Sequence, residues 1–165
     1  MDAVLVSAFD PERTLGVRGR QGREMDTDWD VLATRYVRLV EAGPRTQVER
    51  DALNELLGRA ASTFPKDRAA AVAWFVSALR DTPKKWFVAK ILDRVSPVPR
   101  ALLDPLLDAA LRELNPSANR LFIAPCVRTF GRDAVRERLS ALAEGMDGCA
   151  EVGLERAMYW VNRTP

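Results

Sequence analysis

Apolar residues recur along most of the chain at the spacing of a helix that buries one face. From about residue 28 onward they return every three or four positions, and most runs end at or beside a Gly, Pro, Asn or Asp residue. The pattern predicts eight helices, at about residues 28–41, 46–63, 67–80, 83–95, 100–114, 117–130, 133–143 and 147–162. It also places Val40, Val48 and Leu114 on buried faces. No segment alternates over the length that a sheet core needs, so we expect an all-α fold.

One apolar stretch occurs twice. Residues 86–95 read WFVAKILDRV and residues 121–130 read LFIAPCVRTF, with Phe87 and Phe122 aligned at an offset of 35 residues. A helical period of this length is typical of stacked helix pairs, because a single pair cannot bury its apolar faces alone. The connections between helices are short, so we expect sequential helices to be antiparallel neighbours in about four pairs.

The turns and prolines of these pairs follow a shared pattern. It comprises a proline inside a first helix, Asp or Asn in the turn between the two helices, and a basic residue early in the second helix: Pro105; Asp81 and Asn115; Lys85 and Arg120. On these residues the chain resembles HEAT-like and armadillo-like repeat proteins, over about residues 28–163 and best over 67–145. The first pair matches poorly, and Pro125 lies in a second helix where the family pattern has no proline.

The resemblance implies a right-handed α-α superhelix, that is, a HEAT-like solenoid of about four antiparallel helix pairs. It also implies that the turn residues Asp81 and Asn115 form a structural ladder with Lys85 and Arg120, which joins adjacent repeats. Basic residues recur at intervals of 35 at Arg50, Lys85 and Arg120, with Arg156 one residue past the next expected position, and the alternative reading is a basic ladder for phosphates on the inner face.

Composition limits the chemistry. The 165 residues are 47% hydrophobic and 29% charged with a net charge of +2, which is typical of one soluble domain and indicates neither a nucleic-acid nor a membrane partner. The absence of histidine excludes histidine triads and His-ligated metals. Cys126 and Cys149 lack metal-ligand spacing, and we expect free thiols in a reducing cytoplasm, although a bridge between them stays open. We expect no cofactor and no enzymatic activity.

Residues 1–27 differ in kind from the rest. Three glycines alternate there with three arginines: Gly16, Gly19, Gly22, Arg18, Arg20 and Arg23. This composition predicts a flexible basic arm, which either touches an anionic partner or is a frayed terminus. Residues 28–165 are expected to form a single helical repeat domain.

Arginines recur near the ends of the four second helices, at Arg59, Arg94, Arg128 and Arg163. Each could simply complement its helix dipole. Four in register could instead form a rim that holds an acidic peptide or a nucleic-acid backbone. The carboxylates of Asp104 and Asp108, four residues apart, are read as a solvated helix surface rather than as an acid–base pair.

Three aromatic residues, Trp86, Tyr159 and Trp160, fall off the most regular apolar stripes. If the second helices line the concave surface, as in related solenoids, these residues face into it beside basic side chains and can anchor a partner. Packing between neighbouring pairs is the alternative. The candidate partner-binding residues are Trp86, Lys90, Arg94, Arg128, Tyr159, Trp160 and Arg163.

The sequence favours a non-enzymatic interaction module that binds a protein partner in a concave groove, as an adaptor, chaperone-like factor or inhibitor. The alternative is a nucleic-acid-binding HEAT-like protein with an Arg-rich rim and exposed Trp, similar to the alkylation-repeat DNA glycosylases. A homodimer that covers Val152 and Met158 of the last helix also stays open.

Overall fold

The computed structural model describes residues 27–43, 46–65, 69–146 and 150–165. Within these ranges it contains eight α-helices, one 3-10 helix and no strand, which confirms the all-α class. The elements are α1 (Trp29–Glu41), α2 (Gln47–Ser62), α3 (Ala69–Ala78), α4 (Thr82–Leu92), η1 (Arg100–Leu102), α5 (Leu103–Arg112), α6 (Arg120–Phe130), α7 (Arg132–Glu144) and α8 (Ala150–Arg163). The predicted basic arm lies outside the described residues, apart from Thr27.

Local chemistry sets where the first helices begin and end. The carboxylate of Asp28 accepts a hydrogen bond from the Val31 N–H at 3.0 Å and caps α1. Thr46 and Glu49 form a reciprocal capping box at the start of α2, which satisfies two N–H groups that the helix leaves free. Between α6 and α7 the chain turns at Gly131, whose φ of 85° is strained for any residue with a Cβ.

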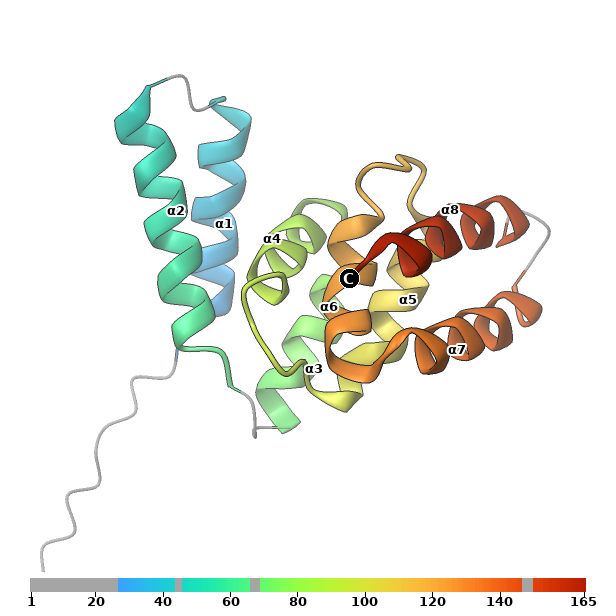
Figure 1. Ribbon diagram of the computed structural model, residues 1–165. Coiled ribbons are helices and arrows are strands. Elements are labelled where there is room, and N and C mark those ends of the chain that lie inside the picture. The colour runs from blue at the N-terminus through green and yellow to red at the C-terminus, as the bar shows by residue number, and fades with distance from the viewer. Residues whose placement is uncertain (1–26, 44–45, 66–68, 147–149) are drawn as a thin grey trace, which may run out of the picture.

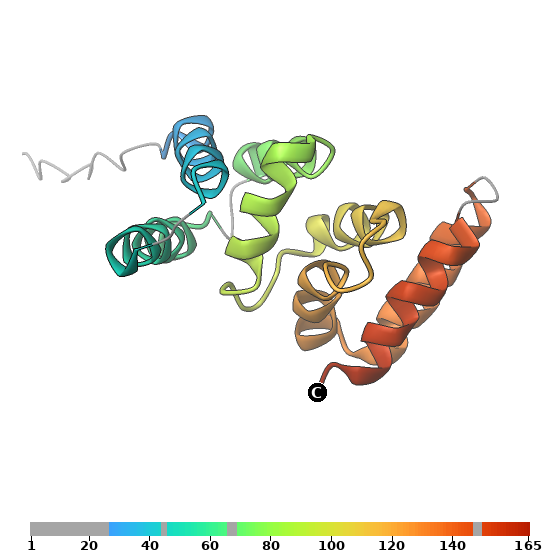
Figure 2. The ribbon, with the colours of Figure 1, turned by 90° about the horizontal axis from the view of Figure 1, so that it is seen from above.

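The helices pack in chain order as the pairs α1–α2, α3–α4, α5–α6 and α7–α8, and consecutive pairs contact each other. α1 lies beside α2, and both contact α4, while α3 packs against α4 (Figure 1). α4 contacts α6, and α7 and α8 both pack against α5 and α6. Seen from above in Figure 2, the pairs follow one another from α1 and α2 at one end to α7 and α8 at the other. Each pair therefore touches its neighbours in sequence.

The core runs through these contacts. Phe87 and Phe122, the aligned phenylalanines of the repeated stretch, are both fully buried. The ring of Tyr36 on α1 lies 5.5 Å from that of Phe87, and the ring of Trp29 lies 4.8 Å from that of Phe75 on α3. Aromatic contacts thus join the first pair to the second.

Three predicted core positions are wrong. Leu114 is 81% exposed, because α5 ends at Arg112 and the backbone is already extended at Glu113, so the helical stripe no longer directs the next side chain. Val48 is 77% exposed in the first turn of α2, and Val40 is exposed near the end of α1. Both valines belong to the α1–α2 pair, which within the described residues packs only against the α3–α4 pair.

Within the described ranges, none of the helices combines the length and the apolar character needed to cross a membrane.

Candidate interaction surface

Lys85 joins α4 to the connection between α5 and α6. Its Nζ lies 2.8 Å from Oε2 of Glu113, and the main-chain N–H of Asn115 donates to Oε1 of the same carboxylate at 2.9 Å. Lys85 and Asn115, two members of the expected ladder, are therefore linked through Glu113 rather than directly. Asp81, a third member, lies 3.8 Å from Lys84. Arg120, the fourth, lies over the Trp160 ring at 6.0 Å from its centroid.

Glu113 is a nearly buried carboxylate, and its ionisation depends on this link. Burial on its own raises the pKa of Glu113, but the hydrogen bonds from Lys85 and from the Asn115 N–H outweigh it and hold the pKa below its ordinary value. Glu113 is consequently ionised at neutral pH. Removing either partner of this ion pair would leave a nearly buried charge without compensation, which destabilises the contact between the two helix pairs.

Two of the four rim arginines tie successive pairs together. Arg94, two residues beyond α4, donates to the main-chain oxygen of Asn54 on α2 at 3.2 Å and to its side-chain oxygen at 3.0 Å. Arg128 on α6 donates to the main-chain oxygen of Asp93 at 2.9 Å and to its carboxylate at 3.2 Å. These guanidinium groups are engaged within the chain, which leaves them less available to a phosphate or an acidic peptide.

Trp86 and Trp160 are largely packing residues. The Trp86 ring lies 5.7 Å from that of Phe122, and the ammonium of Lys85 covers it at 4.8 Å from its centroid. Trp160 is partly buried and donates from Nε1 to the main-chain oxygen of Pro116 at 2.6 Å. Both tryptophans join neighbouring helix pairs, whereas Lys90 is exposed.

A strip of side chains runs along one face of α8, in which Val152, Tyr159 and Arg163 are exposed and Arg156 is partly buried. It consists of Val152, Arg156, Tyr159 and Arg163, whose spacing places them on one face of the helix. Val152 is 49% and Tyr159 is 51% exposed, and the guanidinium of Arg163 lies 5.1 Å from the centroid of the Tyr159 ring. Leu114 joins them, because Nη1 of Arg156 donates to its main-chain oxygen at 2.9 Å. We call these five residues the α8 strip.

The strip is partly one that sequence reasoning missed. The sequence indicates Tyr159 and Arg163 as candidate partner-binding residues, Val152 as a position that a homodimer could cover, and Arg156 as a member of a possible basic ladder. Leu114 was expected to be buried, and only the end of α5 two residues earlier brings it to the surface.

The strip and its border carry three arginines: Arg156, Arg163 and Arg120, which lies over Trp160. In the part of the chain that the structure describes, none of the three forms an ion pair with a carboxylate. The acidic residues of α8, Glu151 and Glu155, occupy its other flank.

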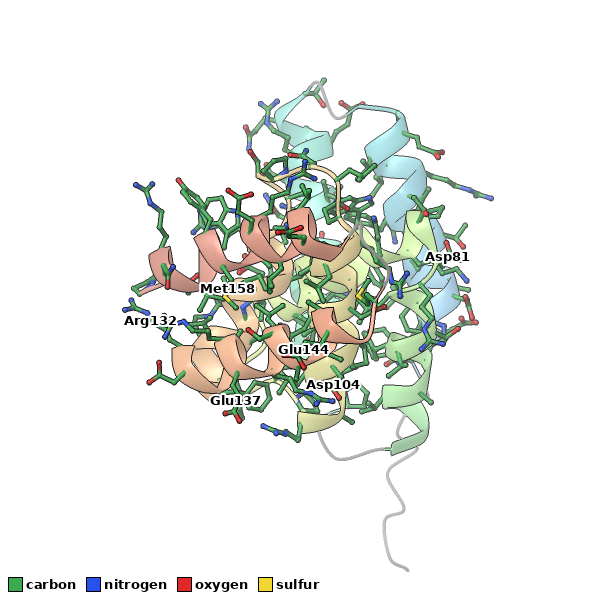
Figure 3. The ribbon with its side chains drawn as sticks, turned by 90° about the vertical axis from the view of Figure 1, so that its right-hand side faces the viewer. Asp81, Asp104, Arg132, Glu137, Glu144 and Met158 are labelled. Carbon is green, nitrogen blue, oxygen red and sulfur yellow. The ribbon has the colours of Figure 1, made fainter. Side chains whose placement is uncertain are left out.

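That flank faces α7. Glu155 shares its helix face with Asn162, and the side chain of Asn162 accepts a hydrogen bond from Arg136 of α7 at 2.9 Å. Figure 3 views this end of the molecule and shows Glu137 and Glu144 on α7 and Met158 on α8. The cationic side of α8 is therefore the side toward α6 and the α5–α6 connection.

A cleft of about 720 Å³ lies where the α3–α4 turn meets α5 and α7. It contains Asp104 and Asp108, but both carboxylates are engaged. Arg138 of α7 donates to Asp104 from Nε at 2.7 Å and from Nη2 at 2.5 Å, which lowers the pKa of Asp104. Arg112 holds Asp108 at 3.0 and 3.1 Å. Asp104 is ionised at neutral pH and therefore cannot act as a general acid there. This supports the interpretation of Asp104 and Asp108 as part of a solvated helix surface rather than an acid–base pair.

The thiol of Cys126 is free and buried on α6, and burial raises its pKa above the ordinary range. Cys149, its suggested partner, lies outside the described residues. Among the residues that the structure covers, no three His, Cys, Asp or Glu side chains are grouped so that they could hold a metal ion.

Comparisons of the chain with protein-family models, with curated proteins and with solved structures find no match.

Proposed function

We propose that this chain is a HEAT-like helical repeat protein that acts as a non-enzymatic protein-interaction module. The repeat architecture is supported by the 35-residue offset between two stretches that are buried in the same way, at Phe87 and Phe122. It is also supported by the contacts that Arg94 and Arg128 make with the preceding pair. Contacts limited to sequential neighbours are what a solenoid requires.

The observation that carries the interaction role is the α8 strip. Leu114, Val152 and Tyr159 are three large apolar or aromatic side chains left in water beside arginines. Patches of this kind, rimmed by polar groups, are typical of surfaces that bind another protein. Tyr and Arg are also the residue types that contribute most to such interfaces.

A protein partner is favoured over a nucleic acid by the state of the arginine rim. A nucleic-acid backbone is bound through many free cations that follow its phosphates. Arg94 and Arg128 donate to Asn54 and Asp93, and the net charge is only +2. The residues left exposed on α8 combine charge with apolar area, which a phosphate track does not need.

Site-specific photocrosslinking tests the proposal. A photoreactive phenylalanine analogue replaces Tyr159, and a matched variant carries it at Arg59, which is exposed on α2. After irradiation in extract of the cells that make the protein, we expect discrete protein adducts from position 159 that are absent from position 59. Identical adduct patterns at the two positions, or adducts that nuclease removes, would contradict the proposal.

A further inference from the structure

The α8 strip has a composition that defines the chemistry of its partner. We propose that it binds an acidic amphipathic helix, which lies along α8 on the side of the α5–α6 connection. The proposal rests on the interaction role proposed above and specifies the partner of the same surface. It follows from three features of the strip: its shape, its unpaired cations and the position of the nearby acidic residues.

The shape suits a helix. Val152 and Arg163 are eleven residues apart on one face of α8, so the strip extends over about 16 Å. A second helix of three or four turns covers such a length and places apolar residues at i, i+4, i+7 and i+11 against it. Leu114 stands 81% exposed beside Arg156 and forms the side wall of this path. Val152, Tyr159 and Leu114 are the apolar contacts that the incoming helix would cover.

The arginines in and beside the α8 strip favour a partner that carries carboxylates. Arg156 uses Nη1 for the main-chain oxygen of Leu114, and Arg163 and Arg120 lie over the aromatic rings of Tyr159 and Trp160. Guanidinium groups held in this way lose little freedom on binding and keep donors for the forked contact with a carboxylate. Within the described chain, none of these three arginines forms an ion pair with a carboxylate. Carboxylates on the partner would therefore complete their ion pairs.

The acidic flank fixes the side on which the partner lies. Glu151 and Glu155 lie on the α7 side of α8 and repel an acidic helix there. Arg120 and Arg156 attract it on the opposite side. The partner therefore lies between α8 and the start of α6, in contact with Leu114, and does not bridge α8 and α7.

A designed peptide tests this directly. The probe is a fluorescent helical peptide of about 16 residues, with Leu at i, i+4, i+7 and i+11 and Glu on both flanks of the leucines. A second peptide has Lys in place of each Glu, and a labelled single-stranded oligonucleotide is the third probe. Binding to the full chain is followed by fluorescence anisotropy at low and at moderate salt.

We expect saturable binding of the Glu peptide, weakened by salt, and none of the Lys peptide. The double variant Arg156→Glu, Arg163→Glu should lose at least about tenfold in affinity for the Glu peptide and gain affinity for the Lys peptide. The matched control is Arg35→Glu, Arg38→Glu on exposed positions of α1, which carries the same charge change and should bind as the unmodified protein does. Circular dichroism melting verifies that both variants are folded.

Three outcomes would overturn the inference. They are equal binding of the Glu and Lys peptides, an equal loss of affinity in the α1 control, and preferential Arg156- and Arg163-dependent binding of the oligonucleotide. If the Glu peptide fails while position 159 still crosslinks to a protein, the partner has different chemistry and the interaction role remains. If both experiments fail, the interaction role is rejected as well.

Discussion

Nη2 of Arg128 donates to the main-chain oxygen of Asp93 at 2.9 Å and to its carboxylate at 3.2 Å, and so joins α6 to α4 across 35 residues of sequence. Arg94 makes the corresponding connection from α4 to Asn54 on α2. Within the described residues, Arg163 makes no corresponding hydrogen bond to the preceding pair. Arg163 instead lies over Tyr159 on the surface of α8.

Because Arg128 joins two helix pairs, we expect its removal to lower the stability of the fold. Arg128→Ala removes both hydrogen bonds to Asp93, so we expect the free energy of unfolding to fall by about 0.5–1 kcal/mol, the range for a partly exposed ion pair with good geometry. Urea denaturation measures the change. Arg59→Ala, at the exposed rim position of α2, is the control and should change stability by less than about 0.5 kcal/mol. Equal losses in the two variants would contradict this account of the rim.

Gly153 marks a close approach of α8 to α5. A Cβ on Gly153 would lie 2.0 Å from the main-chain oxygen of Leu111, and a backbone atom cannot rotate away as a side chain can. Gly153→Ala must therefore push the two helices apart, and we expect a loss of at least about 2 kcal/mol in thermal or urea unfolding.

Gly58 provides the opposite case. It is exposed inside α2, and nothing lies within 4 Å of the position that its Cβ would take. Gly58→Ala should stabilise the protein by about 0.5–1 kcal/mol, because alanine restricts the unfolded chain and favours the helix.

For the Gly153→Ala variant, a stability equal to or higher than that of the unmodified protein would show that α8 does not approach α5 as described.

The sequence predicts the helices and their buried faces, but not the contacts between helix pairs. The helices and the buried Phe87 and Phe122 follow from local periodicity, which the sequence contains directly. The partners of Arg94 and Arg128 do not, because they depend on how one pair rests on the next. Leu114 fails for a related reason: its exposure depends on the point at which α5 stops, and the apolar period continues past that point.

The link between Lys85 and Glu113 predicts a dependence of stability on pH. The folded-state pKa of Glu113 lies below its ordinary value of 4.5, so the folded protein binds fewer protons than the unfolded chain near that pH. The stabilisation by this carboxylate is thus complete above about pH 5 and is lost as the pH falls through the folded-state pKa.

Replacing the cation should reverse this behaviour. In Lys85→Met, burial raises the pKa of Glu113, and its charge destabilises the fold at neutral pH by about 1–3 kcal/mol. The difference in unfolding free energy from the unmodified protein should shrink between pH 7 and pH 3.5, as Glu113 takes up a proton. Lys90→Met, on the same helix but exposed, is the control. A difference that stays constant over this pH range would exclude an ionised Glu113.

Cys126 should be chemically inert in the folded protein. Its thiol is buried and donates to the main-chain oxygen of Phe122 at 3.3 Å, and burial disfavours the reactive thiolate. In a Cys149→Ser variant, we expect no reaction with a thiol-specific disulfide reagent in buffer and complete reaction in urea. Rapid labelling of the folded protein would mean that the α6 core opens readily.

The central claim is that the α8 strip binds a partner, while Arg94 and Arg128 hold the helix pairs together. It is tested most directly by the affinity of the acidic helical peptide for Tyr159→Ala and Arg128→Ala, measured beside their melting temperatures. Tyr159→Ala should lose at least about tenfold in affinity and melt as the unmodified protein does, since half of its side chain is in water. Arg128→Ala should melt earlier and keep its affinity within about twofold. Loss of binding in Arg128→Ala together with unchanged binding in Tyr159→Ala would contradict the account.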